Sequence, residues 1–254
     1  MNMEKADRLI SNPTIRKQLE SIGLSYEQYT SLPVEARTLL EQGALTPLIG
    51  LKHTLPNGKT LYIPAKLQLV NIGNGHESLR VFCVSREVVN DLNLAKTQLN
   101  SLKKGKSILR SIVVNGVAKD YILQLDSDTK HILRCPLNKM EEKLTQLESV
   151  ENIQLGLEQK KAMLEGKALK LNVGGEDVVV GVDLRQNQGF KILNGNMDEW
   201  KRQRDMAYDE AHPEFIGLVQ TEKNRWEYRQ FLATQKERER EPTRVLERKS
   251  KRAV

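Results

Sequence analysis

Hydrophobic and polar residues alternate in nearly the same order along two stretches of the chain. The first reads SILRSIVVNG, AKDYILQLD and TKHILRC between residues 107 and 135, and the second reads ALKLNVGG, DVVVGVDL and GFKIL between residues 168 and 193. This alternation, with its Val, Ile and Leu, predicts β-strands. Asn115-Gly116 and Gly174-Gly175 are typical of two-residue hairpin turns. Each stretch is therefore predicted to form an antiparallel hairpin followed by a third strand.

A short helix is predicted before each hairpin. Two segments align here, KTQLNSLKKGKSILR (residues 96–110) and LEQKKAMLEGKALKL (residues 157–171). In each, a glycine follows a glutamine by seven positions, Gly105 after Gln98 and Gly166 after Gln159. Positions 94, 98, 99 and 102, and 155, 159, 160 and 163, lie on one helical face, although Lys160 interrupts the apolar set. Glycine suits the left-handed residue after a helix. We interpret the two Gly-Lys pairs as helix ends and not as phosphate-binding loops.

A more divergent copy of this helix and hairpin module is predicted earlier in the chain. Ser25 and Gln28 have the spacing of a capping box at a helix start, and a helical stretch over residues 35–42 ends at Gly43. Asn57-Gly58 is the expected turn between two strands, and ESLRVFCV (residues 77–84) supplies a third strand. The sequence thus predicts three related modules.

The pattern changes at Asn196, a candidate N-cap with Glu199 three residues later. EKNRWEYRQFLATQKERERE (residues 222–241) is predicted to form one amphipathic helix that Pro242 ends, followed by a disordered basic tail. The predicted fold class is α+β, with tandem small helix-plus-antiparallel-hairpin modules and a helical C-terminal region. The predicted boundaries are residues 1–90, 91–150, 151–195 and 196–254, and the second of these ranges ends in a linker.

Composition favours a soluble, cytoplasmic protein with small cores. Of 254 residues 39% are hydrophobic and 29% charged, and the chain contains no apolar run of membrane-spanning length and no signal-peptide pattern. Cys83 and Cys135 lie in apolar runs and are predicted to be buried free thiols. The four histidines are scattered singly, so we expect no metal site, and no pattern indicates a cofactor.

The net charge of +7 is concentrated in one segment. Residues 92–119 contain six basic residues and no acidic one, whereas residues 153–182 of the next module contain four lysines balanced by four acids. Such a row of cations suits phosphate groups, so the six are candidates for contact with DNA or RNA, although a merely solvated surface explains them equally well. The candidates are Lys96, Lys103, Lys104, Lys106, Arg110 and Lys119.

Aromatic residues gather after residue 196, among basic ones. They are candidates for contact with a protein partner or with bases, and the competing interpretation is that they dock their helix on its own domain. The candidates for partner binding are Trp200, Trp226, Tyr228, Arg229 and Phe231.

The sequence shows none of the motifs expected of a phosphate-loop enzyme, a zinc protease or a serine hydrolase, so we expect no enzyme and no catalytic residue. Asp126 and Asp183 end equivalent strands, which makes a paired-carboxylate site conceivable. Because they occupy the same position in two copies, we favour the interpretation that each stabilises the turn after its strand.

The recurring Leu-x-x-x-Gln and Leu-x-x-Gly-Lys pattern, the Asn-Gly turn and the QLD strand resemble a family of unknown function encoded on conjugative and other mobile elements of Bacteroidota, over about residues 24–231. The resemblance implies stacked modules and a genomic context, and no catalytic residues. A weaker likeness, through Gln159, Gly166, Lys167 and Asp183, is to the C-terminal repeats of bacterial type IA topoisomerases. Those repeats often carry zinc-binding cysteines that are missing here.

These observations favour a non-enzymatic nucleic-acid-binding or accessory protein of a mobile element, which contacts the phosphate backbone through the basic second module. The alternative is a protein-interaction scaffold, or a regulator or inhibitor of a host protein, that binds through its modules and the predicted Trp-containing helix.

Overall fold

The computed structural model describes residues 9, 12–58, 60–73, 76–114, 116–151, 153–209, 215–221 and 225–231. The chain divides into two compact units. The first compact unit comprises residues 1–38, 46–81 and 210–254, and the second comprises residues 39–45 and 82–209.

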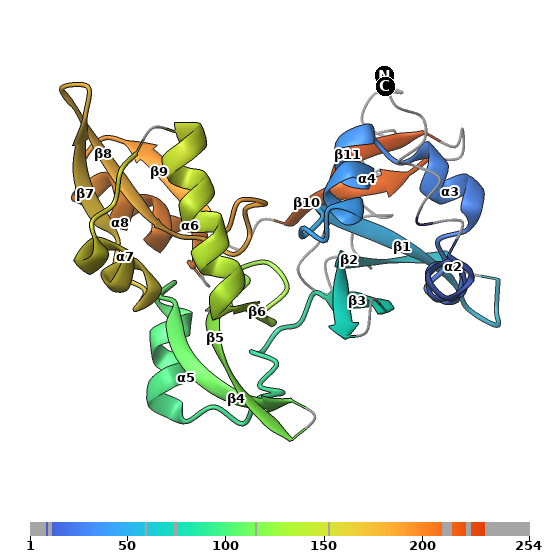
Figure 1. Ribbon diagram of the computed structural model, residues 1–254. Coiled ribbons are helices and arrows are strands. Elements are labelled where there is room, and N and C mark those ends of the chain that lie inside the picture. The colour runs from blue at the N-terminus through green and yellow to red at the C-terminus, as the bar shows by residue number, and fades with distance from the viewer. Residues whose placement is uncertain are drawn as a thin grey trace, which may run out of the picture. The chain divides into compact units, whose positions relative to one another are not determined.

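The first compact unit is built around a five-stranded mixed sheet in the order β11-β10-β1-β2-β3 (Figure 1). Its elements are α2 (Pro13–Ser21), α3 (Tyr26–Ser31), α4 (Val34–Glu41), β1 (Leu48–Thr54), β2 (Thr60–Gly73), β3 (His76–Cys83), β10 (Phe215–Gln220) and β11 (Trp226–Phe231), the last residues of α4 and β3 being assigned to the second unit. β1 pairs in parallel with β10 and antiparallel with β2. Buried Ile15, Leu19, Tyr29, Ile49 and Leu67 contribute to its core.

The predicted amphipathic helix over residues 222–241 is wrong where the structure describes it. Trp226–Phe231 forms β11, which pairs antiparallel with β10, so a strand pair replaces the expected helix. Aromatic residues at Trp226, Tyr228 and Phe231 suit a strand, and β10 joins them to β1 in one sheet. The predicted tail and residues 222–224 and 232–241 of that helix lie outside the described residues. The helix predicted after Asn196 is confirmed as α8 (Met197–Ala207).

The second compact unit contains two copies of the predicted module (Figure 1). The second module comprises α5 (Lys96–Lys103), β4 (Ile108–Val114), β5 (Val117–Leu125) and β6 (Ile132–Pro136), and the third comprises α7 (Leu157–Leu164), β7 (Leu169–Val173), β8 (Glu176–Val182) and β9 (Phe190–Asn194). Both sheets are three-stranded antiparallel meanders, β4-β5-β6 and β7-β8-β9. The two helix-plus-meander predictions are therefore confirmed. Asn115 lies outside the described residues, although Gly116 has the positive φ of 77° that its turn needs.

The helix starts and stops predicted for the modules are also confirmed. A glutamine side chain accepts a hydrogen bond from the N-cap N–H in each case: Gln28 from Ser25, Gln98 from Ala95 and Gln159 from Gly156. Gly43, Gly105 and Gly166 all have a left-handed φ, between 70° and 84°. The next N–H donates to the carbonyl five residues earlier in all three, from Ala44, Lys106 and Lys167. The first module therefore shares this local pattern, although α3 and α4 replace its single helix.

Between these two modules lies α6 (Leu137–Glu151), where the sequence analysis places a linker. Met140, Leu144 and Leu147 are buried on one face of α6. They pack in one core with Ile122 of β5 and with the third module's Val178 and Val180. A second core joins Leu102 of α5 to β5, β6 and Tyr208. α6 thus closes the core that the two modules share.

The prediction of buried thiols is wrong for Cys83, which is exposed, and Cys135 is only partly buried. On β3 the buried side chain is that of the preceding residue, Phe82, which packs with Leu45 and Leu133. Because side chains alternate along a strand, Cys83 points away from that core. Both cysteines are free.

Candidate functional site

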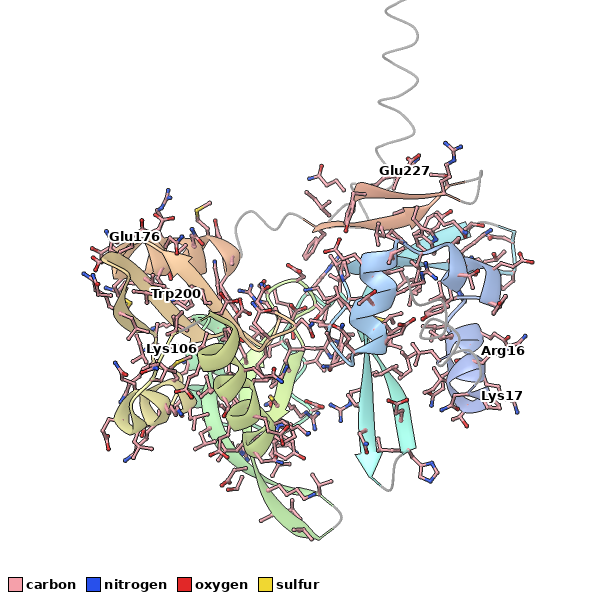
Figure 2. The ribbon with its side chains drawn as sticks, turned by 45° about the horizontal axis from the view of Figure 1, so that its top comes forward. Arg16, Lys17, Lys106, Glu176, Trp200 and Glu227 are labelled. Carbon is pink, nitrogen blue, oxygen red and sulfur yellow. The ribbon has the colours of Figure 1, made fainter. Side chains whose placement is uncertain are left out.

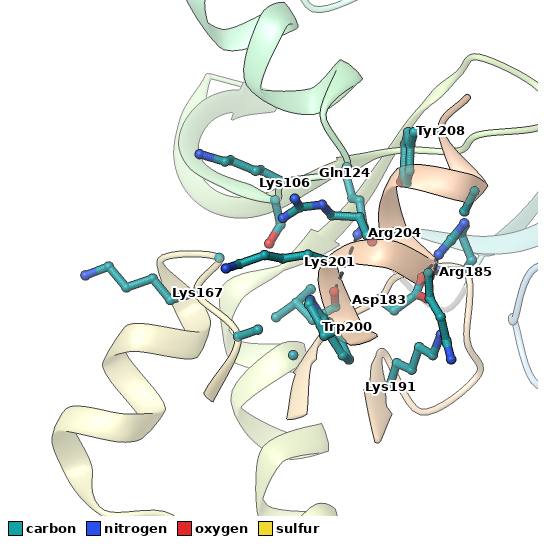
Figure 3. A pocket seen from close by; sticks show the side chains of 18 of the residues that line it. Lys106, Gln124, Lys167, Asp183, Arg185, Lys191, Trp200, Lys201, Arg204 and Tyr208 are labelled. Carbon is teal, nitrogen blue, oxygen red and sulfur yellow. Dashed lines mark hydrogen bonds and ion pairs between the residues drawn. The ribbon is translucent and has the colours of Figure 1, made fainter. Parts of the chain in front are cut away.

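A cavity of about 480 Å³ lies in the second compact unit, where the second and third modules meet α8 (Figure 3). Its wall comes from the loops that follow α5, α7 and β8, from β5, β8 and β9, and from α8 with Tyr208 just after it. The charged and aromatic lining residues are Lys106, Glu165, Lys167, Asp183, Arg185, Lys191, Trp200, Lys201, Arg204 and Tyr208.

The two Gly-Lys segments form adjoining parts of this wall. A Cβ on Gly166 would lie 2.3 Å from the carbonyl oxygen of Ser107, closer than any real Cβ contact. A Cβ on Gly105 would lie 2.7 Å from Cγ of Arg204 and 2.8 Å from the Tyr208 ring. The interpretation of both glycines as helix ends is confirmed, and each also lets a neighbouring element approach closely.

α8 is anchored to both modules. Asn196 caps the helix by accepting hydrogen bonds from the N–H groups of Asp198 and Glu199, both at 3.0 Å. Trp200 packs on the third module, where a Cβ on Gly181 would lie 2.7 Å from its indole. Just after α8, the Tyr208 hydroxyl donates to the carbonyl oxygen of Leu125 in the second module at 2.6 Å. Burial, the largest cause, raises the pKa of Tyr208, so its hydroxyl stays protonated and serves as a donor.

A polar network that includes Gln124, Asp183 and Arg185 of the cavity wall links the modules. Arg185 holds the carboxylate of Asp183 through two hydrogen bonds of 2.8 and 2.9 Å, donates to Oγ of Ser127 at 3.1 Å and lies 5.4 Å from the Tyr208 ring centroid. Burial opposes its charge, but the hydrogen bonds and charge of Asp183 outweigh burial and raise the pKa of Arg185. Gln124 accepts from the N–H of Leu184 at 2.6 Å. Arg185 and Gln124 therefore each bond across the two modules.

The turn interpretation of the two strand-end aspartates is confirmed. Asp126 is fully buried and accepts from the N–H and hydroxyl of Thr129, at 3.0 and 2.7 Å. Asp183 accepts from the N–H of Arg185 at 3.1 Å in addition to its ion pair. Each carboxylate is thus held by its own turn.

Cations outnumber acids in the wall. Six lysine or arginine residues and two acids line the cavity, and both acids are paired, Asp183 with Arg185 and Glu165 with Lys167 at 2.9 Å. A hydrogen bond from Lys167 lowers the pKa of Glu165. Lys201 and Arg204 pair with Asp198 and Asp205 at 3.4 and 3.0 Å, and since these acids are exposed both pairs are weak.

Four of these cations come from three separate segments, and in Figure 3 their side chains extend toward one side of the cavity. They are Lys106, Lys167, Lys201 and Arg204, and we call them the cationic mouth. Within the described part of the chain, Lys106 makes no salt bridge. Because Lys106, Lys167 and Lys201 are exposed, an anion can reach their ammonium groups.

The structure places all six predicted nucleic-acid contacts on α5, β4, β5 and the loop after α5. Five are exposed, and Arg110 is half-buried and donates to Oε1 of Gln98 at 3.2 Å. Lys103 and Lys104 stand at the C-terminal end of α5, next to the cavity residue Lys106. Lys96 begins α5, and Lys119 lies opposite Ile112 on the β4–β5 hairpin. Only Lys106 among the six lines the cavity.

The predicted partner-binding residues divide between the two compact units. Trp200 lines the cavity, while Trp226, Tyr228, Arg229 and Phe231 belong to β11 of the first unit. Trp226 donates to Oγ of Ser31 at 3.0 Å, and Arg229 pairs with Glu227 at 3.1 Å. Tyr228 is 59% exposed.

Sequence reasoning missed Lys167, Lys191 and Arg185 as cavity residues. The alignment of Gly105-Lys106 with Gly166-Lys167 contained a signal, because equivalent loops of neighbouring modules can meet. Lys191 donates to Oε1 of Gln203 at 2.6 Å and lies 5.9 Å from the Trp200 ring centroid, contacts that depend on how α8 docks.

Residues 16–93 match a family model described as a protein of unknown function, DUF4099. The match covers α3, α4, β1, β2, β3 and most of α2, and the residues that line the cavity all lie beyond it. No curated protein and no solved structure matches the chain. None of the described helices has the length and apolar character needed to cross a membrane. Among the described residues, no group of three or more His, Cys, Asp or Glu side chains is placed to hold a metal ion.

Proposed function

We propose that the protein binds the phosphate backbone of DNA or RNA without catalysing a reaction, as an accessory protein of a mobile genetic element. The genomic context rests on the sequence resemblance alone. The observation that carries the binding proposal is the cationic mouth, where Lys106 of the basic module meets cations from the third module and α8. Phosphate binding needs such convergent cations and little sequence-specific contact.

The charge around the mouth extends this surface. Lys103 and Lys104 lie at the end of α5, separated from Lys106 by Gly105, and both are exposed. A backbone that crosses the mouth would meet them next. The cavity's acids support the non-enzymatic part of the proposal, because Asp183 and Glu165 are each held by a cation and are poorly suited to proton transfer.

Fluorescence anisotropy with labelled single- and double-stranded DNA and RNA over a salt series tests the binding. We expect the triple variant Lys106→Gln/Lys167→Gln/Lys201→Gln to bind about tenfold or more weakly. The slope of log K against log salt should fall by roughly 0.9 for each duplex phosphate that the variant no longer neutralises. Arg204 is retained because its stem packs on Gly105.

The control variant, Lys139→Gln/Lys161→Gln/Lys170→Gln, removes the same charge from the same compact unit, away from the cavity lining. It should bind nearly as the unaltered protein does. No binding at low salt, or an equal loss in both variants, would refute a site at the mouth.

A second candidate function, binding of a protein partner, is favoured by the position of β11 at an edge of the five-stranded sheet, with Tyr228 exposed. An edge strand can pair with a strand of another chain. Tyr228→Lys should then abolish retention of a partner that the unaltered protein captures from host extract. The same variant should leave nucleic-acid anisotropy unchanged, since Tyr228 belongs to the other compact unit.

A further inference from the structure

The β4–β5 hairpin of the second module carries exposed aliphatic side chains. Of the large hydrophobic residues that are exposed in the described part of the chain, four lie on this hairpin, namely Leu109, Val113, Val114 and Val117. Val113 is 69% exposed and Val117 56%. Figure 1 shows strand β4 of the hairpin running past α5. Exposed aliphatic side chains that gather in one place, unlike single ones, are typical of interaction surfaces.

The strand register shows that both faces of the tip are aliphatic. Val114 pairs with Val117, and Val113 pairs with Ala118. Paired residues share a face, so Val113 points to the side opposite Val114 and Val117. On the face of Val114 and Val117, the next pair is Ile112 with Lys119, and the pair after that includes Arg110. The aliphatic tip is therefore backed by two cations on one face.

The third module shows that the fold does not require this tip. Its equivalent hairpin, β7–β8, pairs Val173 with Glu176 and Asn172 with Asp177. Asn172, Glu176 (labelled in Figure 2) and Asp177 are exposed and polar, and Asp177 pairs with Lys170 at 2.6 Å. The same turn on the same scaffold is thus acidic in one copy and aliphatic in the other.

We propose that the β4–β5 tip, formed by Val113, Val114 and Val117, is a wedge that inserts between bases where a nucleic-acid duplex opens into single strands. This inference rests on the proposed nucleic-acid binding and names the structure that is recognised. Aliphatic wedges enter base steps at the cost of unstacking, and that cost is lowest where pairing is already broken. Arg110 and Lys119 would then lie near the phosphates that flank the opened step.

Charge favours nucleic acid over a protein partner for this tip. Residues 92–119, from before α5 through both sides of the hairpin turn, contain six basic residues and no acid. Asp120, the first acid beyond them, accepts a hydrogen bond from Ser111 on the other face of the hairpin. A polyanion complements this surface as a whole. The tip carries no polar side chain that reads base edges, so we expect recognition of junctions and not of sequence.

The test compares affinities for a forked duplex, a blunt duplex and a single strand of the same sequence. The variant Val113→Asn/Val117→Gln copies the polarity of the β7–β8 tip without adding charge. We expect the unaltered protein to prefer the fork by about tenfold, and the variant to lose that preference while its salt-dependent binding to single strands stays within about twofold. The control Glu176→Gln, which follows the β7–β8 turn as Val117 follows the β4–β5 turn, should keep the fork preference.

A second measurement uses 2-aminopurine at the junction, whose fluorescence should rise when the unaltered protein unstacks it and should not rise with the variant. Equal affinity for fork and blunt duplex, or a fork preference that survives in the variant, would overturn the wedge and leave backbone binding intact. If the variant instead loses retention on vesicles of anionic lipid while its fork preference stays, the tip is a membrane contact and the wedge is wrong. By contrast, the cationic-mouth variant Lys106→Gln/Lys167→Gln/Lys201→Gln tests only the site for the phosphate backbone, and its loss of binding does not test the wedge.

Discussion

The second and third modules share one backbone plan and differ in almost everything that their side chains offer. Both have a glutamine at the helix start, a left-handed glycine at the helix end and a three-stranded meander. Residues 92–119 of the second carry six cations and no acid and include an aliphatic hairpin tip, whereas residues 153–182 of the third have balanced charge and a polar tip. The shared positions therefore specify the fold, and the differing positions are where specific function is to be sought.

Equivalent positions can also take different structural roles. Ile108 pairs with Leu123 in the second module, and the aligned residue Leu169 pairs with Val180 in the third. The next residues along those partner strands, Gln124 of β5 and Gly181 of β8, are therefore equivalent. Gln124 bonds across to the third module, while Gly181 leaves room for Trp200. The two copies are thus made complementary to one another and to α8. Neither module is expected to form the cavity alone.

The largest change in stability should come from substitutions in the two turns that hold Asp126 and Asp183. Arg185→Leu leaves the carboxylate of Asp183, only 4% exposed, without its ion pair, and should lower the free energy of unfolding by about 3 kcal/mol. Thr129→Val removes one neutral hydroxyl from Asp126, which keeps the Thr129 N–H, and should cost about 1 kcal/mol. Urea denaturation measures both. Equal losses of unfolding free energy in the two variants would show that the ion pair of Asp183 stabilises the protein no more than the neutral hydrogen bond of Asp126 does.

A smaller effect should distinguish the two helix ends. Gly166→Ala places a methyl group against the Ser107 carbonyl at a φ of 84°, so we expect a loss of about 2 kcal/mol. Gly116→Ala, at a φ of 77° with nothing within 4 Å, isolates the backbone strain and should cost about 1 kcal/mol.

Gly105→Ala should lie between these variants, because it meets the Arg204 side chain and the Tyr208 ring and no backbone atom. Thermal unfolding at constant pH ranks the three. If Gly166→Ala proves no worse than Gly116→Ala, the two Gly-Lys loops do not pack as closely as described.

The local parts of this fold could be predicted from the sequence, and the parts that depend on distant partners could not. Gln98, Gly105 and their equivalents act within one helix turn, so spacing alone identified them. The aromatic and charged residues of the segment 222–241 were interpreted as one amphipathic helix, yet pairing with β10 makes residues 226–231 a strand. The linker expected before residue 151 is mostly α6, although the spacing of Met140, Leu144 and Leu147 contained a helical signal.

The candidate site follows the same division. Lys106 was predicted as a nucleic-acid contact from a run of basic residues that is visible in the sequence. Lys191 and Arg185 reach the cavity through the docking of α8 and the turn after β8, which no local pattern discloses. The Gly-Lys pairs were correctly interpreted as helix ends, and their place in the cavity wall depends on the packing of two modules.

The smallest effect in free energy concerns the acids that the third module has and the second has not. Glu158 and Glu165 correspond to Thr97 and Lys104, and Glu165 pairs with Lys167 of the cationic mouth. Thr97→Glu/Lys104→Glu makes the second module resemble the third, and should weaken nucleic-acid binding about fivefold, or ~1 kcal/mol, at 0.1 M salt. Its stability should change little, since both sites are exposed and a glutamate at Thr97 faces a helix N-terminus.

The reciprocal variant Glu158→Thr/Glu165→Lys should strengthen binding about threefold at low salt, because it frees Lys167 and adds a cation beside it. Anisotropy at two salt concentrations measures both exchanges. Weaker binding after the reciprocal exchange would place the anion away from Lys167. The two exchanges should instead change the affinity in opposite directions, and both changes should diminish as salt rises. That result would establish that the module contacting the polyanion is determined by the charges in which the modules differ and not by the backbone that they share.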